Sequence, residues 1–276
     1  MNCLVNGAAG ESLSLHDRGL HYGDGLFETI AVVNGEMPLW ARHMDRLQRD
    51  ARRLGMSPPE ASLLRDEADR LCAGARRAVL KIILTRGAGR GYRFSPAIPP
   101  TRILYRYPWH DYPSRHAEHG VRARVCELRL GRNPRLAGIK HLNRLEQVLA
   151  RSEWEDEHIA EGLLLDELGH VVEGTQSNLF VVRDGRLFTP ALSYCGVAGV
   201  MRGLIMDEAR RLDISCEEVT LRLGDVLEAD EVFFCNSLIG IWPVRALGEV
   251  RYPPGKITPR LSRQVRRLLQ GEAVLS

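Results

Sequence analysis

The sequence predicts a mixed α/β protein made of two domains. Runs rich in β-branched and aromatic residues alternate with segments of helical periodicity. A stretch with little periodicity, residues 108–120, divides the chain, and 276 residues are enough for one or two domains. We therefore expect an N-terminal α/β domain at residues 1–110, an interdomain linker at 111–120 and a C-terminal domain at 121–276.

The N-terminal domain is expected to contain three strands and two helices. Residues 27–33, 79–85 and 102–107 are rich in strand-forming residues. Asn34-Gly35 after the first of these predicts a hairpin turn, because this pair suits turns that need positive φ. Apolar residues recur at helical spacing over 40–54 and 63–71, whereas 86–100 is a loop rich in glycine and proline.

The C-terminal domain is expected to contain more strands and two longer helices. The strands are predicted at 121–130, 163–166, 178–182, 186–189, 231–235 and 239–246. One helix starts at about Asn143, with Leu145, Val148, Leu149 and Ser152 on one face. The other, at 200–212, follows a glycine-rich turn.

Composition excludes several classes of protein. Apolar residues make up 44% and charged residues 26%, which is ordinary for a globular chain, and a net charge of +3 does not indicate a nucleic-acid partner. The cysteines are scattered and no H-E-x-x-H occurs, so we expect reduced thiols and no metal site. No apolar run reaches the ~20 residues of a membrane span and no signal peptide is evident. These features indicate a cytoplasmic protein without a membrane partner.

Two ionisable residues stand out by their surroundings. Lys140 follows small and apolar residues just before a predicted helix, where partial desolvation favours an amine that attacks carbonyl carbon. Glu173 ends a strand-like run before a polar turn and is placed to pair with a protonated heterocycle nitrogen. A surface lysine and a loop carboxylate are the alternative interpretations.

Two further features are typical of phosphate binding. The turn before Val200 places glycines at a helix N-terminus, where free N–H groups and the helix dipole attract anions. Arg46 lies beside the apolar stripe of an early helix, and its guanidinium can bind a phosphate with two hydrogen bonds. The alternative interpretations are an ordinary helix start preceded by glycine and an arginine that is simply exposed to solvent.

In chain order, these segments resemble the fold-type IV pyridoxal-phosphate enzymes, among which are branched-chain aminotransferases, D-amino-acid aminotransferases and aminodeoxychorismate lyases. The segment HYGDGLFET at 21–29 is similar to their shared opening motif. The lysine segment RLGRNPRLAGIKHLNRLEQV at 129–148 resembles the lyase branch, as do TRGAGRGY at 85–92 and ADEVFFCNS at 229–237. The resemblance covers about residues 6–244.

The resemblance implies a fold and a set of cofactor residues. The N-terminal domain would be a two-layer α/β domain and the C-terminal domain a barrel-like sheet with helices, in a homodimer. Lys140 would link covalently to pyridoxal 5'-phosphate and act as the catalytic base, and Glu173 would contact its ring nitrogen. The phosphate would be held by Arg46, the amides of Val200 and Met201, and Ser237, with Asn178 a further cofactor-site residue.

The resemblance also implies a reaction. Aminodeoxychorismate would be converted to para-aminobenzoate and pyruvate, a step of folate biosynthesis, with substrate supplied by a chorismate-aminating synthase. Arg86 and Asn236 are candidates for its carboxylates, and Tyr22, Phe27 and Thr29 would shape the pocket.

Two alternatives remain open at the level of the sequence. One is a D-amino-acid or branched-chain aminotransferase of the same fold, although such enzymes carry a tyrosine shortly after the lysine where this chain has Arg144 and Leu145. The other is a non-catalytic protein that binds pyridoxal phosphate.

Overall fold

The computed structural model describes residues 2–95 and 98–269, which fold as two compact units. The first unit is Met1–His110 with Ile139–Asn143, and the second is Asp111–Gly138 with Arg144–Ser276. Residues 96–97 of the predicted loop and 270–276 of the predicted C-terminal domain lie outside the described residues. The division differs from the expected boundaries because the lysine segment belongs to the first unit and residues 111–120 belong to the second.

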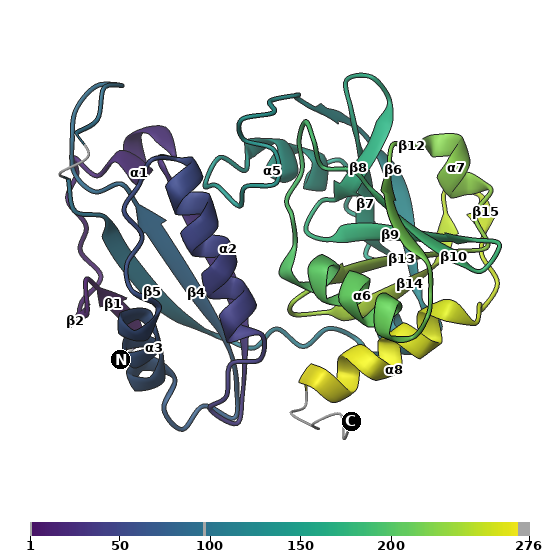
Figure 1. The fold of residues 1–276 in the computed structure, drawn as a ribbon, viewed down its shortest axis with the longest axis horizontal. Coiled ribbons are helices and arrows are strands. Elements are labelled where there is room, and N and C mark those ends of the chain that lie inside the picture. The colour runs from purple at the N-terminus through teal and green to yellow at the C-terminus, as the bar shows by residue number, and fades with distance from the viewer. Residues whose placement is uncertain (1, 96–97, 270–276) are drawn as a thin grey trace. The chain divides into compact units, whose positions relative to one another are not determined.

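The first unit is a two-layer structure (Figure 1). Its described strands form an antiparallel sheet in the order β2-β1-β5-β4-β3. The strands are β1 (Cys3–Val5), β2 (Ala8–Ala9), β3 (Gly25–Val33), β4 (Arg77–Thr85) and β5 (Thr101–Pro108). The helices are α1 (Arg18–Tyr22), α2 (Trp40–Arg53) and α3 (Ala61–Cys72). The predicted strands and helices of this part are therefore present.

Helices α2 and α3 cover one face of this sheet. Buried Leu47 of α2 and Leu64 of α3 share a hydrophobic core with Ile30 and Ile82 of the central strands. Because side chains alternate across a strand, Phe27 and Thr29 face away from this core. The Asn34-Gly35 hairpin is confirmed, since both residues have positive φ, at 52° and 80°.

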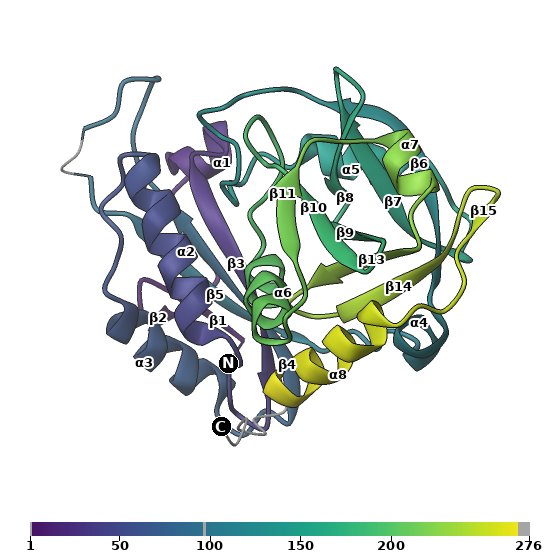
Figure 2. The same cartoon turned by 45° about the vertical axis from the view of Figure 1, so that its right-hand side comes forward.

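The second unit is built on a large mixed sheet that curls into a nearly closed barrel (Figure 2). In the described part its order is β11-β10-β9-β13-β14-β6-β7-β8-β12, and β15 also pairs with β14. The strands are β6 (Val121–Leu130), β7 (Ile159–Asp166), β8 (His170–Gly174), β9 (Asn178–Arg183), β10 (Arg186–Pro190), β11 (Cys216–Val219), β12 (Leu221–Arg222), β13 (Glu231–Asn236), β14 (Gly240–Leu247) and β15 (Val250–Arg251). The predicted α/β class with a barrel-like sheet is confirmed.

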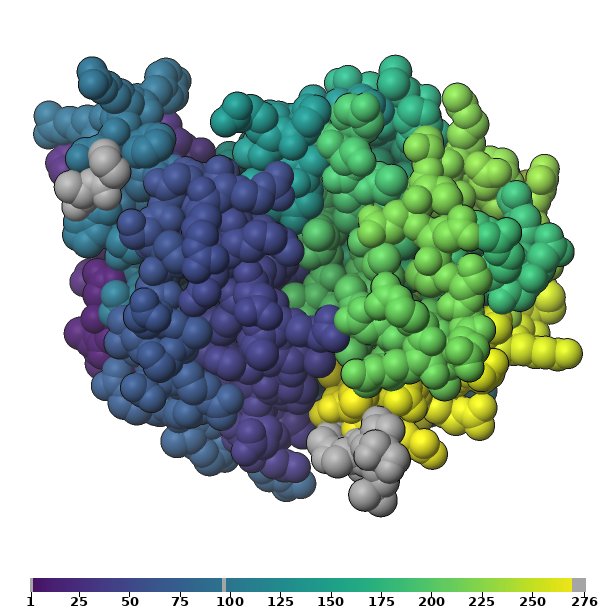
Figure 3. Space-filling view, in the orientation of Figure 1, coloured from purple at the N-terminus to yellow at the C-terminus, as the bar shows by residue number. Residues whose placement is uncertain are grey.

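Helices surround this sheet. They are α4 (Ser114–His119), α5 (Leu145–Arg151), α6 (Val200–Arg211), α7 (Leu223–Leu227) and α8 (Ile257–Leu269). Residues of α8, in yellow, form part of the surface of the second unit (Figure 3). Its N-terminal N–H groups are bound by the buried carboxylate of Glu231, which accepts from Lys256, Ile257 and Thr258 at 2.7–2.9 Å.

Residues 111–120, expected as a linker, are a folded part of the second unit. They contain α4, and the rings of Tyr112 and His116 pack edge-on against Trp242 at centroid distances of 5.2 and 4.9 Å. A six-residue helix is too short to show periodicity, and aromatic contacts with β14 stabilise it.

The cysteines and the helices were also compared with the features of metal and membrane proteins within residues 2–95 and 98–269. The six cysteines are free thiols, and Cys3, Cys72, Cys126 and Cys235 are buried. In residues 2–95 and 98–269 no helix is long and apolar enough to span a bilayer. The same residues contain no group of three or more His, Cys, Asp or Glu side chains arranged to bind a metal ion.

Candidate active site

The lysine segment extends the sheet of the first unit. β3 is the last strand of that sheet, and residues 139–143 run along its edge. The N–H of Phe27 donates to the carbonyl of Lys140 at 3.1 Å, and the N–H of Leu142 donates to Gly25 at 3.0 Å. Backbone pairing therefore fixes the position of Lys140 on the strand that carries Phe27.

Two further contacts orient Lys140. Its own N–H donates to Asp50 Oδ2 of α2 at 3.1 Å, and the preceding Ile139 is fully buried in the core. The side-chain Nζ lies 4.2 Å from the centroid of the Phe27 ring. The predicted lysine and the predicted pocket residue Phe27 are thus brought together.

Arg46 is held by a buried carboxylate that the sequence prediction did not include. Its Nε and Nη2 donate to the two oxygens of Glu28 at 2.8 and 2.5 Å. His43, one helical turn earlier on α2, contacts the same carboxylate through Nδ1 at 2.6 Å. Glu28 therefore fixes the side chains of His43 and Arg46. Two features of the sequence could have indicated this cluster: the i, i+3 spacing of His43 and Arg46, and the single acidic residue within the apolar strand.

The charges of this cluster are set by its burial. Burial alone would raise the pKa of Glu28, but Arg46 and His43 outweigh it and lower that pKa to about 2. Burial lowers the pKa of His43, aided by the charges of Arg46 and Lys140 and opposed by Glu28. His43 is thus neutral, and Nδ1–H donates to Glu28. Among the described residues its buried Nε2 has no hydrogen-bond partner.

The opening motif and the loop after β4 are joined by Asp24. Its Oδ2 accepts from the Nε atoms of Arg18 and Arg86, both at 2.8 Å. The hydroxyl of Tyr22 accepts from the N–H of Gly91 at 3.1 Å. These hydrogen bonds therefore join the opening motif at 21–29 to the segment at 85–92.

Arg86 is buried and bound by protein groups. Nη1 donates to the carbonyl of Gly55 at 3.0 Å and Nη2 to that of Leu54 at 2.8 Å. Its guanidinium carbon lies 3.8 Å from the centre of the Phe94 ring. These contacts favour a role in holding the loop, and the predicted role in binding a substrate carboxylate stays a prediction.

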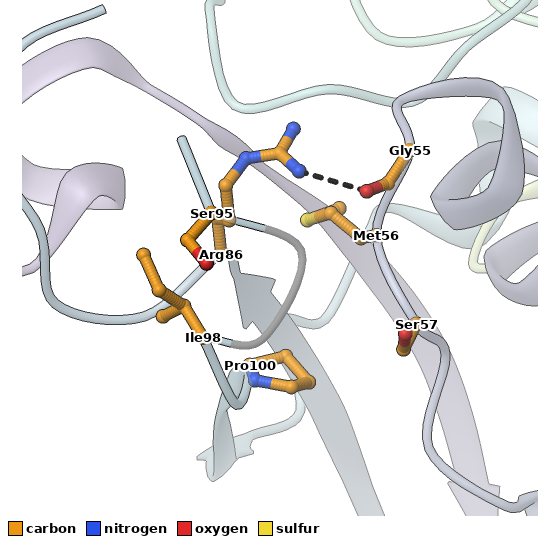
Figure 4. Close-up of a pocket in the computed structure, with 7 residues that line it drawn as sticks. All are labelled: Gly55, Met56, Ser57, Arg86, Ser95, Ile98 and Pro100. Carbon is orange, nitrogen blue, oxygen red and sulfur yellow. Dashed lines mark hydrogen bonds between the residues drawn. The ribbon is translucent and has the colours of Figure 1, made fainter. Parts of the chain in front are cut away.

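Arg86 also lines a small cavity of the first unit (Figure 4). Its volume is about 10 Å³, room for one water molecule. The other lining residues are Gly55, Met56, Ser57, Ser95, Ile98 and Pro100. A cavity of this size does not hold a substrate.

In the second unit, Glu173 and Asn178 bind the same residue. Glu173 Oε2 accepts from the N–H of Val197 at 2.8 Å, and Asn178 Nδ2 donates to the carbonyl of Val197 at 2.8 Å. Gln147 Nε2 lies 3.5 Å from Glu173 Oε1. These contacts, which sequence motifs did not reveal, join the ends of β8 and β9 to the turn that precedes α6.

At the start of α6, the backbone of Gly199 lies close to the side chain of Asn178. Gly199 is its N-cap residue, and a Cβ there would lie 2.0 Å from Asn178 Oδ1. Any other residue here would force Asn178 or the start of α6 to move, and glycine has no side chain that could cap the N–H groups of Val200 and Met201. The predicted helix start and Asn178 are therefore adjacent.

Asn236 and Ser237 lie in the turn after β13. Asn236 Oδ1 accepts from the N–H groups of Leu238 and Ile239 at 2.8 and 2.9 Å, and its Nδ2 donates to the carbonyl of Gln176 at 3.1 Å. This turn is thus tied to the turn that joins Glu173 to Asn178. Ser237 follows directly, and its predicted role stays a prediction.

Comparisons with known proteins agree with this arrangement. The family described as "Amino-transferase class IV" matches residues 25–247. An aminodeoxychorismate lyase from Vibrio harveyi is 37% identical over 262 residues, which cover 93% of this chain and 97% of that protein. The resemblance inferred from the lysine segment is thereby confirmed.

Two solved structures are similar over nearly their whole length. The crystal structure of 4-amino-4-deoxychorismate lyase from Pseudomonas aeruginosa has a TM-score of 0.92 and 48% identity, covering 96% of this chain and 98% of that one. The branched-chain amino acid aminotransferase of Escherichia coli has a TM-score of 0.87 and 26% identity, covering 100% and 96%. The chain therefore belongs to the class IV aminotransferase family.

Proposed function

We propose that the protein is a pyridoxal-phosphate-dependent lyase that converts 4-amino-4-deoxychorismate to para-aminobenzoate and pyruvate. The observation that carries this proposal is the likeness, along nearly the whole chain, to two proteins named as lyases of that compound. Lys140, fixed on the edge of β3 with its amine over Phe27, is the nucleophile that such chemistry needs.

Each unit contains groups that suit this cofactor. In the first, Arg46 is a buried cation that Glu28 fixes in place, and such a cation attracts a phosphate. In the second, the N-terminus of α6 has a glycine N-cap and attracts an anion. We assign phosphate binding to Arg46, the amides of Val200 and Met201, and Ser237.

Glu173 is assigned to the ring nitrogen and Asn178 to the same part of the cofactor site. When bound, pyridoxal phosphate supplies a ring that withdraws electrons from the substrate carbon next to the amine. Glu173, an anchored carboxylate beside Val197, would accept a hydrogen bond from the N–H of the ring nitrogen and hold the proton there. Burial favours this pairing, because Glu173 is 4% exposed.

Lys140 Nζ is the proton-transfer group. With the cofactor bound, the Lys140 amine would take the proton from the substrate carbon that bears the amine. The bond between the ring and the enolpyruvyl oxygen then breaks, the six-membered ring becomes aromatic, and the released enolpyruvate takes up a proton to become pyruvate. Tyr22, Phe27 and Thr29 are assigned to the pocket wall, and Arg86 and Asn236 to the substrate carboxylates.

The test is release of para-aminobenzoate from 4-amino-4-deoxychorismate by the purified protein without any keto acid or added amino acid. The proposal expects para-aminobenzoate and pyruvate in equal amounts, because the lyase reaction needs no second amino substrate. Bound cofactor without either product, under conditions where a known lyase turns over, would refute it and leave a binding protein.

An aminotransferase of branched-chain or D-amino acids is the second candidate, favoured by the likeness to the Escherichia coli enzyme. Arg144 argues against it. Burial lowers the pKa of this guanidinium, at the start of α5, and the charges of Glu173 and Glu146 offset that effect only in part. An arginine thus stands at the position after the lysine where the resemblance implies a tyrosine in aminotransferases. Transfer of an amino group to a keto acid would identify that activity.

We also propose a cytoplasmic homodimer whose contact surface includes α5. Leu145, Val148 and Leu149, the predicted face of this helix, are 75, 61 and 57% exposed. Three neighbouring apolar side chains on one helix face are typical of a surface that a second protein covers. Because the substrate carries an amine, an enzyme that aminates chorismate must supply it, and we propose a functional link to such a synthase.

A further inference from the structure

Glu161 on β7 is a fully buried carboxylate to which the proposed reaction assigns no role. Its Oε1 accepts from the N–H of Gly162 at 3.0 Å and from both the N–H and the hydroxyl of Thr175, at 2.9 and 2.5 Å. Its Oε2 accepts from the hydroxyl of Ser177 at 2.6 Å. Four donors thus converge on one side chain, and three of them come from the turn between β8 and β9.

These bonds attach that turn to β7. The N–H of Thr175 lies 3.0 Å from the carbonyl of Gly162, and the turn is closed by the N–H of Gly174, which donates to the carbonyl of Ser177 at 2.7 Å. A Cβ on Gly174 would lie 2.9 Å from the Glu161 carboxyl carbon and 2.4 Å from Ser177 Oγ. The turn is therefore packed tightly around the carboxylate.

The residues that flank this turn are the assigned cofactor residues of the second unit. Glu173 precedes it and Asn178 follows it, and both bind Val197 ahead of α6. Within the turn, the carbonyl of Gln176 accepts from Asn236, next to Ser237. A shift of the turn would thus move the groups assigned to the ring nitrogen and to the phosphate together.

We propose that Glu161 is a positioning residue that holds the 174–177 turn in place so that Glu173 and Asn178 face the cofactor. The proposal rests on the cofactor roles assigned above to these two residues. Glu161 touches neither cofactor nor substrate and acts through Thr175 and Ser177.

The two carboxylate oxygens of Glu161 accept all four hydrogen bonds. Leucine has no polar atom, so Glu161→Leu leaves these four donors without their acceptor. The side chain stays close in size, and the turn loses its attachment to β7.

Glu231→Leu is the matched control. Glu231 is also buried and accepts from three backbone N–H groups, but those belong to the start of α8. Both variants are expected to lower the Tm of the cofactor-free protein. The two therefore separate a general loss of stability from a specific effect on the turn.

The experiment measures the Kd of pyridoxal phosphate by titration of cofactor-free protein, and the pH dependence of the absorption spectrum of the loaded protein. For Glu161→Leu we expect a Kd higher by about tenfold or more and a spectral pH transition that is shifted relative to the wild type. For Glu231→Leu we expect both to match the wild type. An unchanged Kd and spectrum in Glu161→Leu, or equal changes in both variants, would overturn the proposal.

Two milder variants cover the case in which Glu161→Leu does not fold. Thr175→Val and Ser177→Ala each remove one hydroxyl that donates to Glu161. Each should raise the Kd of the cofactor by a smaller factor, and wild-type values in both would overturn the proposal. A wild-type protein that binds no pyridoxal phosphate would refute the proposed function as well, whereas normal binding and turnover in all variants would refute the role of Glu161 alone.

Discussion

Glu173 Oε2 accepts a hydrogen bond of 2.8 Å from the backbone N–H of Val197. The carboxylate proposed to pair with the cofactor is therefore also an anchor for the turn ahead of α6. The charge of Glu173 is proposed to act on the cofactor, whereas its hydrogen bond holds the turn. Variants that change one without the other can therefore separate the two roles.

Glu173→Gln should keep the anchor and lose the charge. The amide oxygen still accepts from Val197, so we expect Tm close to that of the wild type, while kcat falls by about 100-fold or more because a neutral group does not hold a proton on the ring nitrogen. Glu173→Ala should lose both, with about 1–3 kcal/mol less stability. Wild-type kcat in Glu173→Gln would mean that another carboxylate has this role.

Lys140→Ala should abolish both turnover and covalent cofactor binding. The sequence contains only three lysines, Lys81, Lys140 and Lys256, so borohydride reduction followed by peptide mass spectrometry can identify the modified residue without ambiguity. Lys256→Ala, at an exposed position before α8, is the control and should be labelled at Lys140 like the wild type. A cofactor adduct in Lys140→Ala would contradict the assignment.

Gly199→Ala should weaken cofactor binding. The added Cβ would lie 2.0 Å from Asn178 Oδ1, which forces Asn178 or the start of α6 to move. Gly224→Ala in α7 is the control, since no atom lies within 4 Å of its added Cβ. We expect a raised Kd for pyridoxal phosphate and a lower Tm only in Gly199→Ala; equal behaviour of the two variants would show that the close approach does not matter.

Acid should remove the stabilisation that Glu28 provides. Its folded-state pKa of about 2 lies below the ordinary value of 4.5, so this contribution is complete above pH 4.5 and is lost as the pH falls towards 2. The pKa of His43 is also lowered, so its contribution to the free energy of unfolding begins to decrease once the pH falls below its ordinary pKa of 6.5. Urea unfolding should give Glu28→Gln a lower free energy of unfolding than the wild type at pH 7. The difference between the two proteins should decrease between pH 5 and 3. A constant difference would contradict the assignment.

Leu149→Glu should disrupt the proposed dimer. A carboxylate on the exposed face of α5 would have to be desolvated in an interface, which costs several kcal/mol. Leu168→Glu, at a 59% exposed position in the turn between β7 and β8, is the control. Light scattering should find a smaller particle only for Leu149→Glu. A wild-type protein that is already monomeric would refute the dimer.

Long periodic segments and turn residues were the predictable part of the fold. The helix at 40–53 and the Asn34-Gly35 hairpin have local causes, namely an apolar stripe and two residues that tolerate positive φ. Strands such as β12 and β15, two residues each, have no periodicity and exist only because a neighbouring strand pairs with them. The six-residue α4 is similar.

The candidate site divides in the same way. Lys140 and Glu173 lie in contiguous motifs that can be read directly, whereas Glu28 and Glu161 obtain their partners from tertiary structure. Glu161 precedes Thr175 by fourteen positions, and only the pairing of β7 with β8 brings them together. A sequence pattern contains no signal for such a contact.

The pairing of residues 139–143 with β3 has a consequence for how the chain is made. On the ribosome, β3 emerges more than a hundred residues before its outer neighbour, so its unpaired N–H and C=O groups are exposed to other nascent chains during that interval. A fragment that ends at residue 110 would keep this edge permanently. It should therefore aggregate during expression, and a peptide containing residues 139–143, supplied in trans, is the reagent that would protect it.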